Sequence, residues 1–430
     1  MSILYLIVSL LMLMILAYKG VPIIVAALVC SMFVLLTANI PLVEGLSTVY
    51  MKGMAGFFQS FFLIFLLGAI FGKLIEITGA AESIAKGIID KLGTKKVVPA
   101  IIIAIGILTY GGVSLFVVLF CVYPLGMSLF KKANVSRRLF PALVAAGGAT
   151  FSMTSPFTPA IQNIIPTKYL GTDVTAAALP GTICAVFTFV AVIAYLQWRA
   201  NKLQASGEEF DFKHDLVMEK VEEKELPNIW ISIIPMIALV VSLNVFKVDV
   251  IVAMGIGIIL VLVLLFKHLP NINDIWKNVT KSSTDALIAA GNTCSAVGFG
   301  TVVAATAGFQ SIIIVATSMG GNPLISAALG TTVLAGITGS ASGGLGIAMP
   351  IISDYFLPLG VNPEALHRVA VMACGGLDAL PHNGAVITFL VYCGITHKEG
   401  YKDLAVVAIA IPLISLTLLI ALFYILPGWM

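Results

Sequence analysis

Charged residues are scarce in this sequence. Asp, Glu, Lys and Arg make up 10% of its 430 residues, whereas soluble domains carry about 25%. Hydrophobic residues make up 59% of the chain, and the mean hydropathy is +1.06. This composition excludes a soluble globular protein and indicates a polytopic membrane protein. The net charge of +3 therefore does not point to a nucleic-acid partner.

Motifs of enzymes, metal sites and ATP-driven pumps are also missing. The five histidines are dispersed, and no HExxH or GxSxG motif occurs. No GxxxxGK[ST] loop is evident, so we expect no ATP drive. The six cysteines lie in apolar segments without CxxC spacing, and we expect neither disulfides nor a metal site. The sequence thus predicts a protein that is not an enzyme and uses no cofactor.

Apolar runs of spanning length recur along the chain. The first run lacks a basic start and a small-residue cleavage site, so we expect a retained membrane helix and not a signal peptide. Uninterrupted spans are expected at residues 3–18, 21–38, 57–77, 174–198, 229–246, 248–266, 285–306 and 404–426. Amphipathic pieces at residues 82–92 and 272–282 are expected to lie along the membrane interface.

Four further apolar runs carry polar, Gly- or Pro-rich interruptions. Runs 97–130 and 323–357 are interrupted at 110–114 and 338–344, and runs 139–170 and 363–396 at 152–159 and 378–384. The order of these features is alike in the two halves, a pattern typical of secondary transporters. We therefore predict an all-α polytopic membrane protein with two inverted repeats, each holding a re-entrant hairpin and a broken transmembrane helix.

The predicted division of the chain follows from these features. The first repeat spans residues 1–198, with scaffold helices in 1–92, the hairpin and broken helix in 97–170 and a last helix at 174–198. Residues 199–227, the only substantial hydrophilic stretch, form the expected cytoplasmic linker. The second repeat spans residues 228–430, with its hairpin at 323–357 and its broken helix at 363–396.

Basic residues predict the orientation. If both hairpins enter and leave on one side, each half crosses the membrane five times and the halves are inverted. With both termini outside, the basic clusters within 86–96, 131–138 and 199–224 fall on the cytoplasmic side, as the positive-inside rule requires. The outside keeps little beyond Lys52, Lys168, Lys247 and Arg368. We expect the protein in the cytoplasmic (inner) membrane.

The four interruptions form the predicted transport site. In an inverted repeat they converge near the midplane, where helix N-termini, glycine backbones and Ser, Thr or Asn side chains suit an anion. No Lys or Arg lies within them, which favours a small, singly charged, hydroxylated acid over a dianion. Small-residue helix packing would explain one such cluster, but not four in matching places. The predicted substrate-binding residues are Tyr110, Gly111, Gly112, Ser114, Thr154, Ser155, Thr158, Gly339, Ser340, Ser342, Gly343, His382 and Asn383.

Asp378 is the acidic residue expected near the midplane. A carboxyl group buried at that depth is protonated more readily, so Asp378 is a candidate proton carrier, and His382 could share the proton or bond the substrate. Asp378 could equally cap the half-helix that follows the break. The expected coupling ion is H⁺; Na⁺ is the alternative, since Gly carbonyls and Ser or Thr hydroxyls can hold it without a charged ligand.

The length, the hydropathy, the Gly/Ser-rich tips and a Pro-x-x-Pro break resemble the gluconate:proton symporter (gluconate permease) family, within a wider superfamily of elevator carriers. Gly375-Gly376 and His382-Asn383 look like that family's Gly-Ser and His-Asn positions. The chain departs from the family in lacking a His in the first break and in having Gly384 after the Asn. The resemblance implies uptake of gluconate or a related sugar acid, or of a shorter acid such as 3-hydroxybutyrate. It also implies a homodimer that works by an elevator movement.

A channel or a cation/proton antiporter on the same repeat is the alternative class. It would use Asp378 as its ion site and would not need an organic anion. The single midplane acid and the hydroxyl-rich interruptions favour the organic-anion carrier. The expected partners are thus a small organic anion, membrane lipid and a second copy of the chain, with no nucleic acid.

Overall fold

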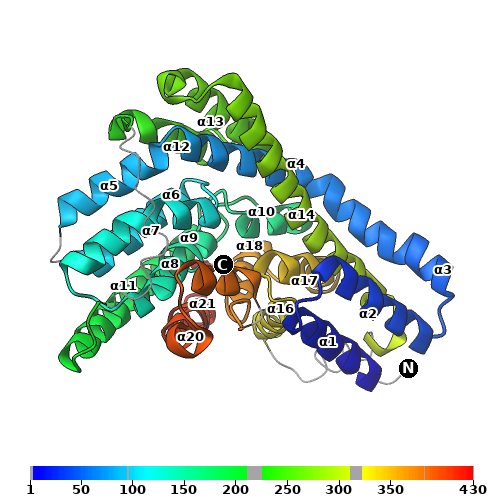
Figure 1. Ribbon diagram of the computed structural model, residues 1–430. Coiled ribbons are helices and arrows are strands. Elements are labelled where there is room, and N and C mark those ends of the chain that lie inside the picture. Colours follow the sequence, from blue (N-terminus) through cyan, green and yellow to red (C-terminus); the bar gives the residue numbers. More distant parts are fainter. Residues whose placement is uncertain (1–2, 94–95, 211–224, 310–321, 382, 430) are drawn as a thin grey trace.

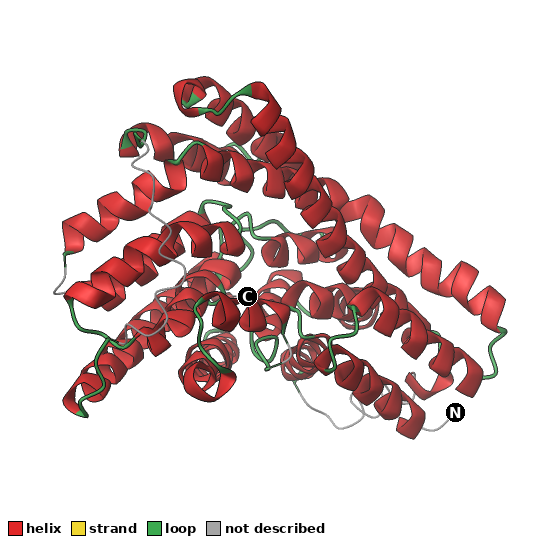
Figure 2. Ribbon diagram, in the orientation of Figure 1, coloured by secondary structure: helices red, strands yellow, loops and turns green. Residues whose placement is uncertain are grey.

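The computed structural model describes residues 3–93, 96–210, 225–309, 322–381 and 383–429. Within these residues all regular secondary structure is helical, and Figure 2 shows helices joined by loops. Five described stretches are long and apolar enough to cross a membrane: Leu42–Ile77, Leu115–Lys132, Ala178–Ala205, Ile272–Ala304 and His397–Ile425. The chain is therefore an all-helical, multi-pass membrane protein, as its composition predicted.

The described helices fall into two halves. The first half contains α1 (Ile3–Tyr18), α2 (Ile23–Thr37), α3 (Leu42–Glu44), α4 (Met51–Ile77), α5 (Ala80–Leu92), α6 (Val97–Tyr110), α7 (Leu115–Lys132), α8 (Phe140–Gly148), α9 (Phe151–Thr154), α10 (Ile161–Leu170) and α11 (Ala178–Ala205). The second half contains α12 (Ile229–Asn244), α13 (Val250–Leu264), α14 (Ile272–Ala304), α16 (Pro323–Thr338), α17 (Ala341–Phe356), α18 (Pro363–Cys374), α19 (Gly384–Tyr392), α20 (His397–Ala405) and α21 (Ile411–Ile425). π-Helical turns at Gly45–Tyr50 and Val406–Ala410 lead into α4 and α21.

Two long helices, α4 and α14, pack against each other along the upper right of Figure 1. The α1–α2 pair packs on α14 through α2, and the α12–α13 pair packs on α4 through α13. The prediction of a separate interfacial helix at 272–282 is wrong, because α14 runs unbroken from Ile272 to Ala304. Residues 272–290 contain neither Pro nor Gly, so nothing in the backbone ends the helix there.

Each predicted hairpin is a pair of packed helices joined by a short tip. Tip one, residues 111–114, connects α6 to α7. Tip two consists only of Gly339 and Ser340, between α16 and α17, and Gly339 has the left-handed φ of 57°. The predicted interruption covered residues 338–344, but α17 already begins at Ala341. The Ser340 hydroxyl caps this helix by accepting from Gly343 N.

The broken helices also lie where the sequence predicted them. The first consists of α8, the single turn α9 and α10, with residues 155–160 (the first break) forming a non-helical loop before α10, in which Phe157 has a φ of 71°. The second consists of α18 and α19, separated by residues 375–383 (the second break). The broken helix of each half contacts the hairpin of the other half. In one contact α10 packs on α17, and in the other the ring centres of Phe116 on α7 and Phe389 on α19 lie 6.3 Å apart.

The end of α11 is fastened to α20 by a buried carboxylate. Asp403 is 0% exposed and accepts from Arg199 Nε at 2.7 Å and from Tyr195 Oη at 2.8 Å. Helix α11 continues to Ala205, beyond the predicted start of the linker at residue 199. Within that predicted linker, residues 211–224 lie outside the described part.

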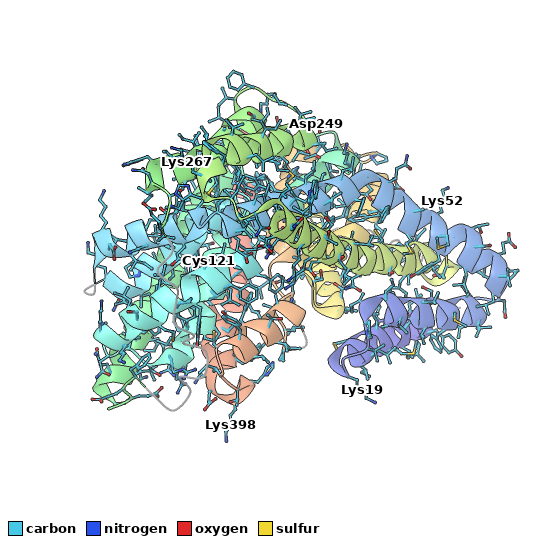
Figure 3. The ribbon with its side chains drawn as sticks, turned by 45° about the horizontal axis from the view of Figure 1, so that its top comes forward. Lys19, Lys52, Cys121, Asp249, Lys267 and Lys398 are labelled. Atoms are coloured by element: carbon cyan, nitrogen blue, oxygen red, sulfur yellow. The ribbon has the colours of Figure 1, made fainter. Side chains whose placement is uncertain are left out.

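Charged side chains collect near helix ends. Lys19 follows α1, Lys267 follows α13, and Lys398 lies in the first turn of α20; Figure 3 shows these lysines at the edges of the molecule. Asp249 caps the opposite end of α13 from Lys267. The apolar bodies of α1 and α13 are thus left free of charge, as a bilayer requires.

The hairpin of α16 and α17 provides a test of this packing. A Cβ atom on Gly344 would lie 2.4 Å from Ala335 Cα and 2.5 Å from Ala335 N, so Gly344→Ala must push the two helices apart. We expect a cost of about 1–3 kcal/mol, seen as a lower thermal unfolding temperature in detergent. Gly330→Ala, on exposed α16 surface with nothing within 4 Å, is the control and should leave that temperature unchanged or higher. Equal unfolding temperatures for the two variants would contradict the packing.

Candidate functional site

The first break is held open by side chains that lie outside it. The carbonyl of Pro156 accepts from Tyr110 Oη at 2.8 Å, and that of Phe157 from Asn244 Nδ2 at 2.8 Å. The carbonyl of Thr158 accepts from Asn163 Nδ2 at 3.0 Å. Each donor comes from outside residues 155–160, so the loop is satisfied by tertiary contacts, as backbone at membrane depth must be.

Arg368 completes this arrangement from α18. Its Nη1 donates to Thr154 O at 2.9 Å, its Nη2 to Val174 O at 3.3 Å and its Nε to Ala176 O at 3.1 Å. The side chain is 0% exposed. An arginine of the second half therefore joins the first break to the loop before α11.

Asn163 and His367 extend the same network. Asn163 Oδ1 accepts from Arg368 Nη1 at 3.1 Å and lies 3.1 Å from His367 Nε2, while Asn163 Nδ2 also donates to Val174 O at 2.9 Å. His367 Nδ1 lies 2.7 Å from Thr172 Oγ1. Because Asn163 Nδ2 donates twice, its Oδ1 is an acceptor, and His367 Nε2 carries the hydrogen between them.

Tip one lies directly on the first break. Besides the bond of Tyr110 to Pro156, Gly112 approaches the ring of Pro159: a Cβ there would lie 3.6 Å from Pro159 Cγ. Gly111 is pressed against α12, since its Cβ would lie 2.0 Å from Met236 Cε. A larger residue at this position would have to displace the end of the Met236 side chain.

Tip two and the second break are joined through Asn383. Its Oδ1 caps α19 by accepting from Ala385 N and Val386 N. Its Nδ2 donates to Gly339 O at 2.8 Å and to Asp378 O at 2.7 Å. The capping role considered for Asp378 therefore belongs to Asn383, as a residue at the start of the second half-helix.

The two breaks meet each other. A Cβ on Gly375 would lie 3.4 Å from Thr154 Cγ2, so the end of α18 contacts the end of α9. A cavity of about 10 Å³ lies at this contact, lined by Ala149, Thr150, Thr154, Thr188, Met372, Gly375, Pro412 and Ser415. It has room for about one water molecule and not for an organic acid. The described conformation is closed here.

The predicted site residues thus fall into one connected chain. Tyr110 and tip one (with Gly111, Gly112 and Ser114) contact the first break (with Ser155 and Thr158). Thr154, directly before the first break, contacts the second break at Gly375. The second break, through Asn383, contacts tip two and the start of α17 (with Gly339, Ser340, Ser342 and Gly343). His382 lies outside the described residues.

The hydroxyl groups of Thr158 and Ser155 in the first break differ in their hydrogen bonding. Thr158 is 0% exposed, and its Oγ1 accepts from Ala160 N at 3.3 Å, so it serves the turn before α10. The hydroxyl of Ser155 is buried and interacts with the hydroxyl of Tyr110, but it makes no hydrogen bond of normal geometry among the described residues. Ser155 is therefore the side chain of the first break whose hydrogen-bonding capacity is least used.

Sequence reasoning missed Arg368, His367 and Asn163. Charge counting used Arg368 only as a basic residue on the outer side of the membrane and gave it no role in the site. It is buried, as are all residues from Ala365 to Cys374. A signal was available: every other side chain in that run except His367 is apolar. An arginine within such a helix has to find its partners inside the protein.

Broken apolar helices that meet through polar loops, in an all-helical multi-pass chain, define a membrane transporter. A model of the GntP family permeases matches residues 1–425. The chain is 38% identical to the uncharacterized transporter YxjC of Bacillus subtilis over 91% of this chain and 93% of that protein. It is 41% identical to the inner membrane permease YgbN of Escherichia coli over 19% of this chain and 17% of that protein.

The chain belongs to the GntP permease family. Among solved structures, the Alcanivorax borkumensis YdaH transporter, described as having an unusual topology, has a similar fold. The TM-score is 0.61 with 15% sequence identity, over 90% of this chain and 89% of that chain. This likeness extends over almost the whole chain and concerns the fold alone.

Asn383 provides a test of how the second break is held. Asn383→Ala removes the cap of α19 and leaves the carbonyls of Gly339 and Asp378 without their donor. Asn228→Ala removes only an exposed cap, that of α12, at a cost of about 1 kcal/mol. We expect Asn383→Ala to lower the thermal unfolding temperature in detergent clearly more, because a buried unsatisfied carbonyl costs about 1–3 kcal/mol. The same shift for both variants would show that Asn383 is only a cap.

Proposed function

We propose that the protein is a secondary active transporter that takes up a small hydroxylated organic anion, gluconate or a related sugar acid, together with protons. The observation that carries the proposal is the connection of both tips and both breaks through Tyr110, Gly375 and Asn383. Residues far apart in the sequence are brought to one place where the helices are interrupted, which is how secondary transporters build a substrate site.

The chemistry of this place suits a hydroxylated carboxylate. Helices α10, α17 and α19 each begin at one of the interruptions, and helix N-termini favour anions. Ser340 and Ser342 lie 3.4 Å apart, oxygen to oxygen, at tip two, and the hydroxyls of Ser155 and Tyr110 lie together at the first break. Hydroxyl groups can both donate to a carboxylate and accept from a sugar hydroxyl. A shorter acid such as 3-hydroxybutyrate is the alternative substrate.

Proton coupling is assigned to Asp378. This residue is 9% exposed in the second break and takes part in no ion pair among the described residues. A carboxyl group in such a place can exist in its neutral form and can gain or lose a proton during transport. His382 is proposed to share that proton. Sodium coupling is the alternative.

Matched packing in the two halves supports an inverted repeat. The α1–α2 pair on α14 corresponds to the α12–α13 pair on α4, and α6 against α8 corresponds to α16 against α18. The α10–α17 contact corresponds to the approach of α19 to α7. We propose that α4, α14 and the flanking pairs form the scaffold, and that the hairpins and broken helices move as a body in an elevator-type homodimer. The positive-inside rule favours the cytoplasmic membrane with both termini outside.

Uptake into proteoliposomes tests the substrate. Labelled gluconate and 3-hydroxybutyrate should accumulate under an imposed gradient with the acidic side on the side of entry, and more slowly when the gradient is dissipated by a protonophore. A sodium gradient in place of the pH gradient is the control for the coupling ion. No gradient-dependent accumulation of any hydroxy acid would overturn the proposed function.

Asp378→Asn tests the proton carrier. The amide cannot release a proton, so pH-driven accumulation should fall by about tenfold or more, while substrate exchange without a gradient should continue. The control is Asp354→Asn, a change at an exposed carboxyl near the end of α17, which should leave both unchanged. Unchanged pH-driven accumulation in Asp378→Asn would move the coupling role to His382 or to sodium.

A further inference from the structure

Arg368 uses all of its donors on neutral oxygen atoms. Its Nε donates to Ala176 O, its Nη1 to Thr154 O and Asn163 Oδ1, and its Nη2 to Val174 O and Ala176 O. A guanidinium group has five N–H donors, and each of them is accounted for by these bonds. Arg368 therefore has no donor left to hold a substrate directly.

The charge of Arg368 is not in direct contact with a carboxylate. Among the described residues, no carboxylate forms an ion pair with it. Asp173 and Glu364 act on it only at longer range, because Asp173 pairs with Lys247 at 2.8 Å and Glu364 accepts from Ala177 N at 3.1 Å. A buried, unpaired cation is costly, and an anion placed near it recovers part of that cost.

The place where an anion would feel this charge is the first break. Nη1 lies 2.9 Å from Thr154 O, and the next residue is Ser155. Ser155 is 6% exposed, and its hydroxyl interacts with that of Tyr110 without a hydrogen bond of normal geometry. The guanidinium is held on its other side by α11, where a Cβ on Gly181 would lie 3.0 Å from Arg368 Nε. The charge is thus fixed in position on one side of Ser155.

We propose that Arg368 is a positioning residue of the transport site that supplies the positive potential for an anion bound at Ser155 without touching it. Through Thr154 it also sets the shape of the first break. Asn163 and His367 keep its guanidinium in place. This inference deepens the proposed function and rests on it, since it assigns the attraction for the anion to a residue outside the four interruptions.

A pair of charged thiol reagents tests the potential without a transported substrate. In a protein whose six native cysteines are replaced by alanine, Ser155→Cys introduces a single thiol. Its reaction rates are measured with the anionic ethylsulfonate and the cationic ethyltrimethylammonium methanethiosulfonates. Arg368→Gln should lower the ratio of anionic to cationic rate by about tenfold, and Arg368→Lys, which keeps the charge, by less than about threefold.

Asn163→Asp is a second variant. It keeps the oxygen that accepts from Arg368 and His367 and places a carboxylate beside the guanidinium, but it loses the amide donor to Thr158 O and Val174 O. Asn163→Ala, which loses the same donor without adding a charge, is its control. Asn163→Asp should lower the ratio as Arg368→Gln does, and it carries the test if Arg368→Gln fails to give a monodisperse protein. An unchanged ratio in Arg368→Gln and Asn163→Asp overturns the proposal. A thiol that reacts with neither reagent also overturns it, because position 155 then does not face the path of an anion.

Transport kinetics separate this role from a purely structural one. For gluconate uptake, Arg368→Lys should keep the apparent KM within about threefold, while Arg368→Gln should raise it about tenfold or more. Equal loss of uptake in both variants, with equal loss of thermal stability, would mean that Arg368 only holds the fold. Absence of gluconate uptake by the unaltered protein would contradict the proposed substrate, and the ratio of reagent rates would then decide the role of Arg368 separately.

Discussion

The structure depends on one constraint, which is that backbone groups inside a bilayer must be satisfied by the protein itself. At the first break, side chains from four elements meet this requirement: Tyr110 from α6, Asn163 from α10, Asn244 from α12 and Arg368 from α18. Because these donors come from both halves of the chain, the break has no stable form until both halves have packed. The hydrogen bonds of the first break therefore depend on the packing of the two halves.

The second break meets the same constraint with fewer partners. Asn383 supplies both the cap of α19 and the donors to Gly339 and Asp378, so one amide joins tip two, the break and the half-helix. No charged side chain is involved in these bonds. The two breaks therefore differ in electrostatics, since a guanidinium holds the first and an amide the second. The first break therefore lies beside a positive charge, whereas the second break contains the carboxyl group of Asp378.

Much of the fold could be predicted from the sequence because it rests on local rules. Apolar length predicted the spans, and the Gly, Pro and Ser/Thr clusters predicted both tips and both breaks to within a few residues. The end of α18 before Gly375 and the start of α19 after Asn383 follow from the capping preferences of these residues. The error at 272–282 has a physical reason too, because polar residues do not end a helix in which no Pro, Gly or cap intervenes.

The sequence by itself determined that the chain crosses a membrane, is entirely helical in its described part and interrupts its helices at four polar segments. Only the tertiary structure decided what lies beside those segments. Arg368 is separated by 192 residues from Ala176 and by more from its other acceptors, all of which lie in the first half. Charge counting used it only to orient the chain in the membrane. The reason is that hydropathy reports how much of a helix is apolar, whereas the partners of a buried charge are set by which helices pack together.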